Sequence, residues 1–264
     1  MVQRFFLPVA CASSLALASV VSCSSSSTSG TGIGGDGDAG RVDAATPDAA
    51  SLEAGPGPDP LVGCTKDPGP TAPAFDPTSA TDPIGGADKF TLAMALAGFS
   101  AGTGKLTAAI STEQSSIKCE LLEATAPLSV ANFVGLARGT RPYKLSTKWQ
   151  VGRFYDGLTW HRVIPNFVIQ GGDPSGDGTG GPGYDMVKEN QLDEPLGTLA
   201  MAASSKPSGS QFYIVVGKGP AANYNVFGTC STENAIAIAA VPRDDADMPK
   251  TPVHLIKVEI ARCP

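Results

Sequence analysis

The stretch WHRVIPNFVIQGGD, Trp160–Asp173, combines a strand-like apolar pattern with two polar side chains, Arg162 and Gln170. A Pro-Asn pair divides it into two short strands, so the alternation of side chains need not carry across the break. Arg162 and Gln170 can then face the same side as Phe167. A guanidinium beside an aromatic ring and an amide suits an uncharged polar ligand with an apolar part. In the alternative interpretation, which the residues alone favour slightly, the Arg162 stem covers apolar surface and its head meets water.

Other motifs in the chain do not specify a reaction. GDGTGG, residues 176–181, matches a dinucleotide-binding pattern, but Pro and Gly follow it and no helix begins there, so we predict a flexible surface loop. His161 has no carboxylate partner nearby in the sequence, and His254 lies on an alternating strand, where we expect a structural role. GFSAG, residues 98–102, matches G-x-S-x-G, but it ends a segment expected to be helical instead of following a strand, so it does not mark a serine nucleophile. Hydrolysis therefore has no specific support.

Short β-rich runs and two main helices must position these residues. Residues 105–112 and 116–123 alternate in polarity and predict an antiparallel hairpin. Residues 127–138 place apolar side chains on one face between a Pro start and a Gly stop, which predicts a helix. A second helix is expected over residues 231–241, capped by Ser or Thr, and a short leading helix over residues 89–99. A β-barrel or sandwich with helices at its ends fits this tally.

Residues 1–22 resemble an export signal. A positive residue precedes a short apolar run, and the sequence VVSC then ends at Cys23. This arrangement resembles a bacterial lipobox, which implies cleavage before Cys23 and attachment of lipid to it. The alternative is an ordinary secretory signal cut nearby; the apolar run is too short for a comfortable transmembrane helix. We expect an exported protein, lipid-anchored to a bacterial membrane and facing the periplasm or the cell exterior.

Composition divides the remainder into a tether and a domain. Residues 23–86 are rich in Ser, Gly, Ala, Asp and Pro and nearly free of aromatic side chains. Such a segment cannot bury enough apolar surface to offset the cost of ordering the chain, so we predict a disordered tether. The globular domain is expected over residues 87–264. With a net charge of −6 and no basic patch, the chain does not suit a nucleic-acid partner.

Four cysteines remain once the signal is removed and Cys23 is lipidated: Cys64, Cys119, Cys230 and Cys263. An even number in an oxidising compartment favours one or two disulfides, with three possible full pairings that the sequence cannot separate. The alternative is that they are buried free thiols. No C-x-x-C or Cys/His spacing indicates a redox motif or a zinc site.

Four segments together resemble the cyclophilins, which are peptidyl-prolyl cis-trans isomerases. FYDGLTWHRVIPNFVIQGGDPSGDGTGG is similar to the central motif of that family, and APLSVANFVGLARG to its first helix. LAMAASSKPSGSQFYIVV is similar to the segment that ends in the Gly-Ser-Gln-Phe-Phe signature, and NYNVFG to the stretch that closes the pocket. The resemblance runs from Leu106 to Ile260. It implies a mainly β fold, a closed eight-stranded antiparallel barrel capped by two helices.

The resemblance also implies rotation of X-Pro bonds and the residues responsible. Rotation must break amide resonance, a barrier of roughly 20 kcal/mol, and makes or cuts no bond, so we expect neither cofactor nor metal. The catalytic residues implied are Arg162, which would donate a hydrogen bond to the twisted prolyl nitrogen, Phe167 in the proline pocket, and Gln170, which would orient the arginine and the substrate carbonyl. The substrate-binding residues implied are Val168, Ala202, Ala203, Gln211, Tyr213, Pro220 and Tyr224.

Several positions depart from the family pattern. Tyr213 replaces a usual Phe, Tyr224 stands where His is frequent, and Gly219-Pro220 stands where many relatives have Trp or Phe and then Leu. Because the Trp that favours cyclosporin is missing, we expect weak or no binding of that drug. The expected partners are proline-containing polypeptides, chiefly exported proteins during folding. The altered rim motivates an alternative, a proline-peptide binding module or holdase with little turnover; the tether alone motivates a third, a structural envelope lipoprotein.

Overall fold

The folded unit is built mainly from β-strands, as the sequence predicts. The computed structural model describes residues 58–71, 73–99, 102–220 and 224–264, so the predicted signal and Cys23 lie outside the described residues. The strands are β1 (Thr65–Lys66), β2 (Lys105–Ser111), β3 (Ser116–Leu121), β4 (Tyr143–Lys144), β5 (Trp149–Gln150), β6 (Leu158–Val163), β7 (Val168–Asp173), β8 (Thr198–Ala203), β9 (Pro207–Val215), β10 (Val226–Cys230), β11 (His254–Leu255) and β12 (Lys257–Cys263). The helices are the 3-10 helix η1 (Ala87–Lys89) and the α-helices α1 (Leu92–Ala95), α2 (Pro127–Arg138) and α3 (Glu233–Ala239).

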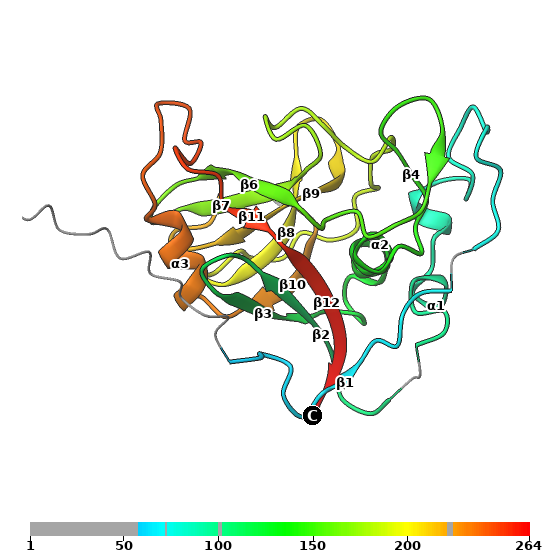
Figure 1. Ribbon diagram of the computed structural model, residues 1–264, viewed down its shortest axis with the longest axis horizontal. Coiled ribbons are helices and arrows are strands. Elements are labelled where there is room, and N and C mark those ends of the chain that lie inside the picture. The colour runs from blue at the N-terminus through cyan, green and yellow to red at the C-terminus, as the bar shows by residue number, and fades with distance from the viewer. Residues whose placement is uncertain (1–57, 72, 100–101, 221–223) are drawn as a thin grey trace, which may run out of the picture. The chain divides into compact units, whose positions relative to one another are not determined.

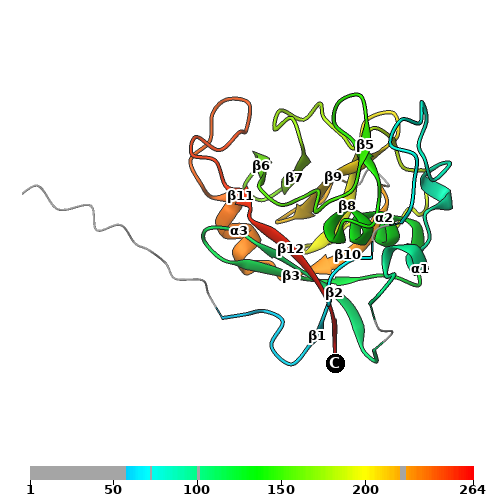
Figure 2. The same cartoon turned by 45° about the vertical axis from the view of Figure 1, so that its right-hand side comes forward.

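Ten of these strands form one curled antiparallel sheet. Its order is β1-β12-β2-β3-β10-β8-β9-β7-β6-β11, and β4 pairs separately with β5. The predicted hairpin is present as β2 and β3, where Ile110 lies opposite Ile117. Figures 1 and 2 show the sheet curving around the interior, with α2 and α3 on different sides of it. The long strands therefore present one face to the main core and the other outward.

The ends of the sheet do not meet as a closed barrel would require. Eight strands have five to nine residues, but no ladder of hydrogen bonds within the described residues closes the ring. The segment from residue 254 to residue 263 serves both ends instead, because β11 pairs with β6 and β12 pairs with β2. The expectation of closure is wrong because this segment is interrupted at Ile256. The Ile256 N–H bonds to the Ser111 carbonyl at 2.8 Å, and its side chain is half exposed.

Helix α2 carries the centre of the core and confirms the helix predicted there. Pro127 occupies its first turn, where a missing N–H costs nothing, and Gly139 ends it in the left-handed conformation with φ 84°. The ring of Phe133 packs on three others at centroid distances of 5.2 to 5.4 Å, those of Tyr155, Phe212 and Phe227. This aromatic cluster supports β9 and β10 from the inside.

The two other predicted helices are shorter than expected. Helix α1 covers only four residues of the range 89–99, and α3 covers residues 233–239 of the range 231–241. Ser231 does not cap α3, because its hydroxyl accepts a hydrogen bond from the Lys118 N–H on β3 at 3.1 Å. Among the described helices, none has the length and apolar character that crossing a membrane requires.

The folded part begins earlier than the sequence indicates. Strand β1 lies in the segment predicted as a tether, yet it pairs with β12 and places Thr65 opposite Arg262. Leu61 is almost fully buried against Ala109 and Ala261. Residues 58–71 and 73–86 therefore differ from the expected disordered tether. Their low aromatic content does not indicate a folded segment. They are ordered by strand pairing and ion pairs with the rest of the domain, not by a hydrophobic core of their own.

Two buried arginines, one at the end of α2 and one shortly after it, hold this N-terminal segment in place. Arg138 is 0% exposed, and its Nε and Nη2 atoms donate to the two carboxylate oxygens of Asp67 at 2.8 and 2.7 Å. Arg141, equally buried, donates to Asp82 at 2.9 Å and lies 4.1 Å above the ring of Tyr184. A buried guanidinium that lost its carboxylate would remain as an uncompensated charge.

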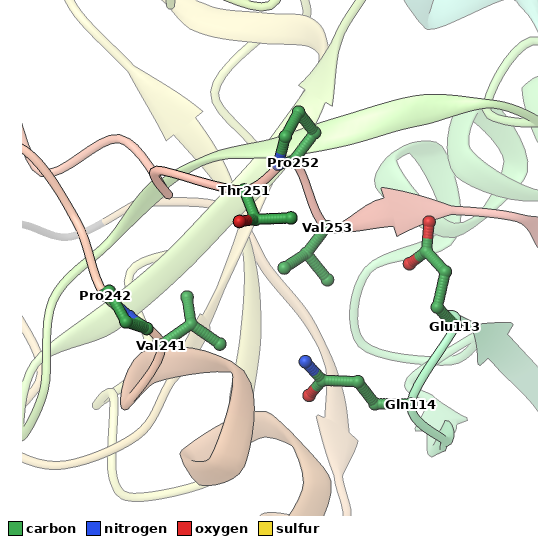
Figure 3. A pocket seen from close by; sticks show the side chains of 7 residues that line it. All are labelled: Glu113, Gln114, Val241, Pro242, Thr251, Pro252 and Val253. Carbon is green, nitrogen blue, oxygen red and sulfur yellow. The ribbon is translucent and has the colours of Figure 1, made fainter. Parts of the chain in front are cut away.

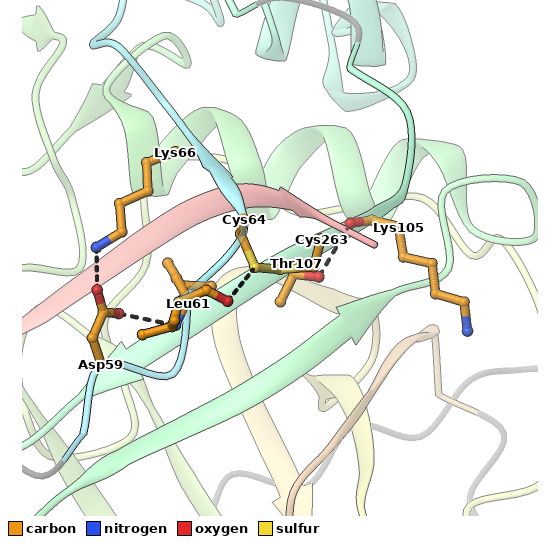
Figure 4. Close-up of a disulfide and its surroundings, with 8 residues drawn as sticks. Asp59, Leu61, Cys64, Lys66, Lys105, Thr107 and Cys263 are labelled. Atoms are coloured by element: carbon orange, nitrogen blue, oxygen red, sulfur yellow. Dashed lines mark hydrogen bonds and ion pairs between the residues drawn. A yellow bond between two sulfur atoms is a disulfide. The ribbon is translucent and has the colours of Figure 1, made fainter.

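Two disulfides add covalent links to this arrangement. Cys64 is bonded to Cys263 and so joins the N-terminal segment to the end of β12, as Figure 4 shows. Cys119 is bonded to Cys230 across the neighbouring strands β3 and β10. The sequence leaves the pairing open, and the structure has two disulfides in this pairing. The four cysteines are therefore not free thiols.

A chain that begins at residue 87 should be much less stable than one that begins at residue 58. The shorter chain loses Asp67, Asp82 and Cys64, so two guanidinium groups that are buried in the longer chain lose their carboxylate partners and one disulfide is lost. Breaking one buried pair costs about 3 to 5 kcal/mol, so we expect the free energy of unfolding to fall by at least about 3 kcal/mol. Denaturant titration of both chains measures this difference. Equal unfolding midpoints would show that the segment adds nothing to stability.

Candidate functional site

The outward face of the sheet carries a second, smaller apolar cluster. On β7, Ile169 belongs to the main core, whereas its neighbour Val168 packs outward against Tyr213 and Val215 of β9. This alternation follows from the period of two along a strand. The outward cluster also includes Phe167 and forms the base on which the candidate site is built.

A cavity of about 210 Å³ lies over this cluster. The resemblance implies ten catalytic or substrate-binding residues. Nine of them line this cavity, and they come from segments far apart in the chain. They are Arg162, Phe167, Val168, Gln170, Ala202, Ala203, Tyr213, Pro220 and Tyr224. The fold thus brings together side chains that the sequence alone could only connect by resemblance.

Strand register places the polar groups of the cavity in one row. Arg162 on β6 lies opposite Gln170 on β7, and Gln170 lies opposite Tyr213 on β9. The Arg162 guanidinium carbon is 5.9 Å from the centre of the Phe167 ring, and its side chain is 41% exposed. The guanidinium is therefore partly fixed by an aromatic face and still open to a ligand.

The Pro-Asn break turns the chain as the sequence predicts. Asn166 has a positive φ of 58°, a conformation that Asn tolerates better than most residues. The turn is closed by hydrogen bonds from the Phe167 N–H to Ile164 at 3.1 Å and from the Ile164 N–H to Val168 at 2.9 Å. Arg162 and Phe167 consequently reach the same side of the sheet.

Gln211 lies beside the cavity and does not line it. Its side-chain amide donates to the carbonyls of Gly178 and Gly180 at 2.9 and 2.8 Å, so its own oxygen must act as acceptor. The Gln170 amide donates to that oxygen at 2.9 Å. This chain of bonds fixes the orientation of Gln170 and leaves its carbonyl oxygen directed away from Gln211. Gln211 also lines an adjoining polar hollow that includes Ser208 and Lys206.

The Gly-rich loop is bonded more tightly than the predicted flexible loop. The Asp173 carboxylate accepts hydrogen bonds from the backbone N–H groups of Ser175, Asp177 and Gly178 at 2.8, 3.1 and 2.5 Å. Together with Gln211, Asp173 therefore holds residues 176–181 at the end of β7. The glycine spacing of residues 176–181, which matches a dinucleotide-binding pattern, therefore belongs to this turn.

The floor of the cavity contains a polar group under an apolar rim. Tyr213 is almost fully buried, and its ring packs edge-on against Tyr224 at 5.8 Å. Burial, together with the nearby Glu194 carboxylate, raises the pKa of Tyr213 far above its usual range. Within the described residues, neither the Tyr213 hydroxyl nor Oε2 of Glu194 has a hydrogen-bond partner. The substitution of Tyr for the usual Phe thus puts a neutral hydroxyl at this floor.

The rim at Gly219 has no room for a side chain. A Cβ atom on Gly219 would lie 2.2 Å from the Glu194 carbonyl oxygen and 3.0 Å from its Cβ atom. No side chain fits there without displacement of the backbone. Pro220 and Tyr224 therefore supply the side chains of this rim.

The histidines and tryptophans fill structural positions. Trp160 and Trp149 are buried and serve as packing side chains. His161 is also buried, and the desolvation of its ring lowers its pKa, so the neutral form is favoured. Neither ring nitrogen of His161 has a partner among the described residues. His254 binds Glu113 at the surface and lies outside the cavity.

A larger cavity elsewhere contains none of the predicted site residues. It measures about 430 Å³ and, as Figure 3 shows, lies between the β2–β3 turn, the end of α3 and the chain before β11, with Val241, Val253 and Pro252 on its walls. In the described part of the chain, no group of three or more His, Cys, Asp or Glu residues is placed to hold a metal ion.

A family model for the cyclophilin type peptidyl-prolyl cis-trans isomerases (Pro_isomerase, "Cyclophilin type peptidyl-prolyl cis-trans isomerase/CLD") matches residues 107–260. The chain belongs to the cyclophilin family. It is 43% identical over 168 residues to peptidyl-prolyl cis-trans isomerase A of Mycobacterium tuberculosis (strain ATCC 25618 / H37Rv), an alignment that covers 59% of this chain and 92% of that protein. It is 46% identical over 118 residues to peptidyl-prolyl cis-trans isomerase B of Bacillus subtilis (strain 168), covering 42% and 73%.

Solved cyclophilins have the same fold. The crystal structure of a cyclophilin type isomerase of Cryptosporidium parvum matches with a TM-score of 0.52 at 26% identity, over 61% of this chain and 99% of that one. A structure of the same protein in the presence of the dipeptide Ala-Pro matches with a TM-score of 0.50 at 27% identity, over 58% and 98%. This cyclophilin is accordingly an enzyme of the peptidyl-prolyl cis-trans isomerase class.

Three acidic residues around the cavity are not identifiable from the sequence. Asp173 follows the central motif and binds its loop, Glu194 lies behind Tyr213, and Asp247 lies 4.0 Å from the Arg162 guanidinium. Asp247 is 85 residues beyond Arg162 in the chain. The positive-φ turn that holds it contains no glycine, so no residue type marks the position.

Proposed function

We propose that this cyclophilin accelerates X-Pro rotation with Arg162 as the electrostatic group and the adjoining cavity as the proline pocket. The observation that carries this proposal is the meeting of Arg162, Phe167 and Gln170 at one cavity on the outward face of the sheet. The cavity, about 210 Å³, has room for several water molecules of about 30 Å³ each and hence for a five-membered ring.

The chemistry requires preferential binding of a twisted amide. Planar cis and trans forms share their nitrogen lone pair with the carbonyl, whereas the twisted form localises it on nitrogen. A guanidinium N–H that donates to this nitrogen is therefore worth more in the transition state than in either ground state, which is the condition for catalysis. Partial enclosure of Arg162 against Phe167 strengthens the interaction, because nearby water is reduced.

The remaining residues hold the substrate on either side of the bond. Phe167, Val168 and Tyr213 surround the space for the proline ring, while Gln170, fixed by Gln211, faces the acyl side. Ala202 and Ala203 lie at the C-terminal end of β8, where the pairing with β9 becomes irregular and main-chain groups can bond to an extended peptide. The presence of Ala-Pro with the Cryptosporidium parvum relative supports proline-containing peptides as substrates.

We also propose that the protein works outside the cytosol on exported clients, with lipid at Cys23 as its anchor. The signal-like residues 1–22 support this, and so do the disulfides Cys64–Cys263 and Cys119–Cys230, which favour an oxidising compartment. About 35 residues of Ser-, Gly- and Ala-rich chain separate Cys23 from the first described residue, enough to hold the domain away from a membrane surface.

Arg162→Ala should lower kcat/KM for an Ala-Pro peptide by about 100-fold, the usual effect of removing one preorganised donor. Arg162→Lys should recover only part of it, because a point charge lacks the planar fork. A coupled cis/trans assay measures turnover, and thermal unfolding controls for folding. Full turnover in Arg162→Ala would contradict the assigned role. Peptide binding without turnover in the natural sequence would favour the binding-module alternative.

Cyclosporin should bind weakly, and a tryptophan at the family position should not restore binding. Gly219→Trp would force its Cβ atom against the Glu194 carbonyl, so we expect a loss of stability and no gain in affinity. Isothermal titration of the natural sequence and the variant tests both statements, with thermal unfolding alongside. Submicromolar binding by either protein would contradict this prediction.

Cys23→Ser should release the protein from the membrane fraction of a bacterial host, since a serine cannot accept the thioether-linked lipid. Fractionation and metabolic labelling with a fatty acid measure the two consequences. Cys11→Ser is the matched control, because this cysteine lies within the predicted signal and is removed with it. Fatty-acid label that persists in Cys23→Ser, or no label in the natural sequence, would contradict lipidation at this residue.

A further inference from the structure

We propose that Asp247 is a positioning residue that holds the Arg162 guanidinium in its working orientation. The proposal rests on the function assigned above to Arg162. Oδ2 of Asp247 lies 4.0 Å from Nε of Arg162, and both side chains are partly enclosed, at 33% and 41% exposure. Asp247 comes from the loop between α3 and β11, which contributes no side chain to the lining of the cavity.

Internal hydrogen bonds hold this loop in a conformation that places the Asp247 carboxylate near Arg162. Its two sides meet at a bridge between Arg243 and Pro249. The Asp244 carboxylate accepts hydrogen bonds from the backbone N–H groups of Ala246 and Met248, both at 2.9 Å. The Asp247 N–H donates to the Asp244 carbonyl at 3.1 Å, which closes the turn.

The loop is also tied directly to the strand that carries the arginine. The carbonyl of Asp247 accepts a hydrogen bond from the Val163 N–H at 2.8 Å. Val163 is the next residue after Arg162 at the end of β6. A main-chain bond at this point fixes the separation of Asp247 and Arg162 independently of their side chains.

Asp247 has a backbone conformation that most side chains avoid. Its φ is 63°, and among non-glycine residues in the described chain only Asn166 shares a positive value. Both residues flank the cavity arginine, one in the turn after β6 and one in the loop beside it. Such conformations cost free energy and persist where the surroundings enforce them, often at functional sites.

The two oxygens of the carboxylate have separate partners. Oδ1 accepts a hydrogen bond from Nε of Arg243 at 3.0 Å, which leaves Oδ2 for Arg162. With the carboxylate on the Nε side, the Nη groups of Arg162 stay available to the cavity. The contact is an ion pair at 4.0 Å and not a hydrogen bond, so it orients the guanidinium without occupying its donors.

The Asp247 carboxylate has two opposing effects on catalysis by Arg162. Their balance decides whether its removal lowers or raises turnover. The negative charge weakens the field of Arg162, whereas the contact limits the rotamers of a long side chain that is 41% exposed. Because hydrogen bonding to the twisted nitrogen depends on direction, we expect the loss of orientation to dominate. It should lower kcat and leave KM nearly unchanged, since the proline ring is held by the apolar residues.

Asp247→Asn is the informative variant, because Asn keeps the shape and tolerates a positive φ. We expect kcat to fall about threefold to fivefold, in the range of a partly exposed ion pair. Asp245→Asn is the matched control, since it removes the same charge from an exposed neighbour in the same loop. Equal thermal midpoints in both variants would confirm that the fold is unaffected.

A double-mutant cycle with Arg162→Ala distinguishes failure of the positioning role of Asp247 from failure of the function proposed for Arg162. If Asp247 acts through Arg162, Asp247→Asn should not lower the residual turnover of Arg162→Ala any further. A fall that persists in that background, or equal effects of Asp247→Asn and Asp245→Asn, would overturn the positioning role alone. Full turnover in Arg162→Ala itself would overturn the function proposed for the arginine and this inference with it.

Discussion

The register between β6, β7 and β9 is the constraint on which the site depends. It aligns Arg162, Gln170 and Tyr213 across three neighbouring strands, all on the outward face. A slip of one residue would send these side chains into the core and bring Ile169 to the surface. The Pro-Asn turn, Gly171 packed on the Trp160 ring and the bulges in β6 all act to hold this register.

The frame around these three strands contains buried charge. Arg138 and Arg141 on one side of the sheet draw the N-terminal segment onto α2 through Asp67 and Asp82. The Cys64–Cys263 disulfide then links that segment to β12, the strand that continues from β11 next to β6. The frame is thus stabilised by contacts distant from the cavity, while the cavity itself keeps a partly exposed arginine.

The sequence was informative where local rules dominate and where motifs are contiguous. The helix after Pro127, the β2–β3 hairpin and the turn at Asn166 follow from period and turn chemistry. Nine cavity residues could be named because the family motif supplies their order. The N-terminal segment, the interruption at Ile256 and the Asp247 contact were missed, because each depends on a partner far away in the chain.

We propose that this cavity favours the twisted over the planar X-Pro bond. Exchange NMR on an Ala-Pro peptide with a small amount of the protein tests it directly, because it reports interconversion and binding together. We expect cis/trans exchange within well under a second at unchanged cis and trans populations, against tens of seconds unaided. Line broadening from binding, with exchange still at the unaided rate, would contradict it.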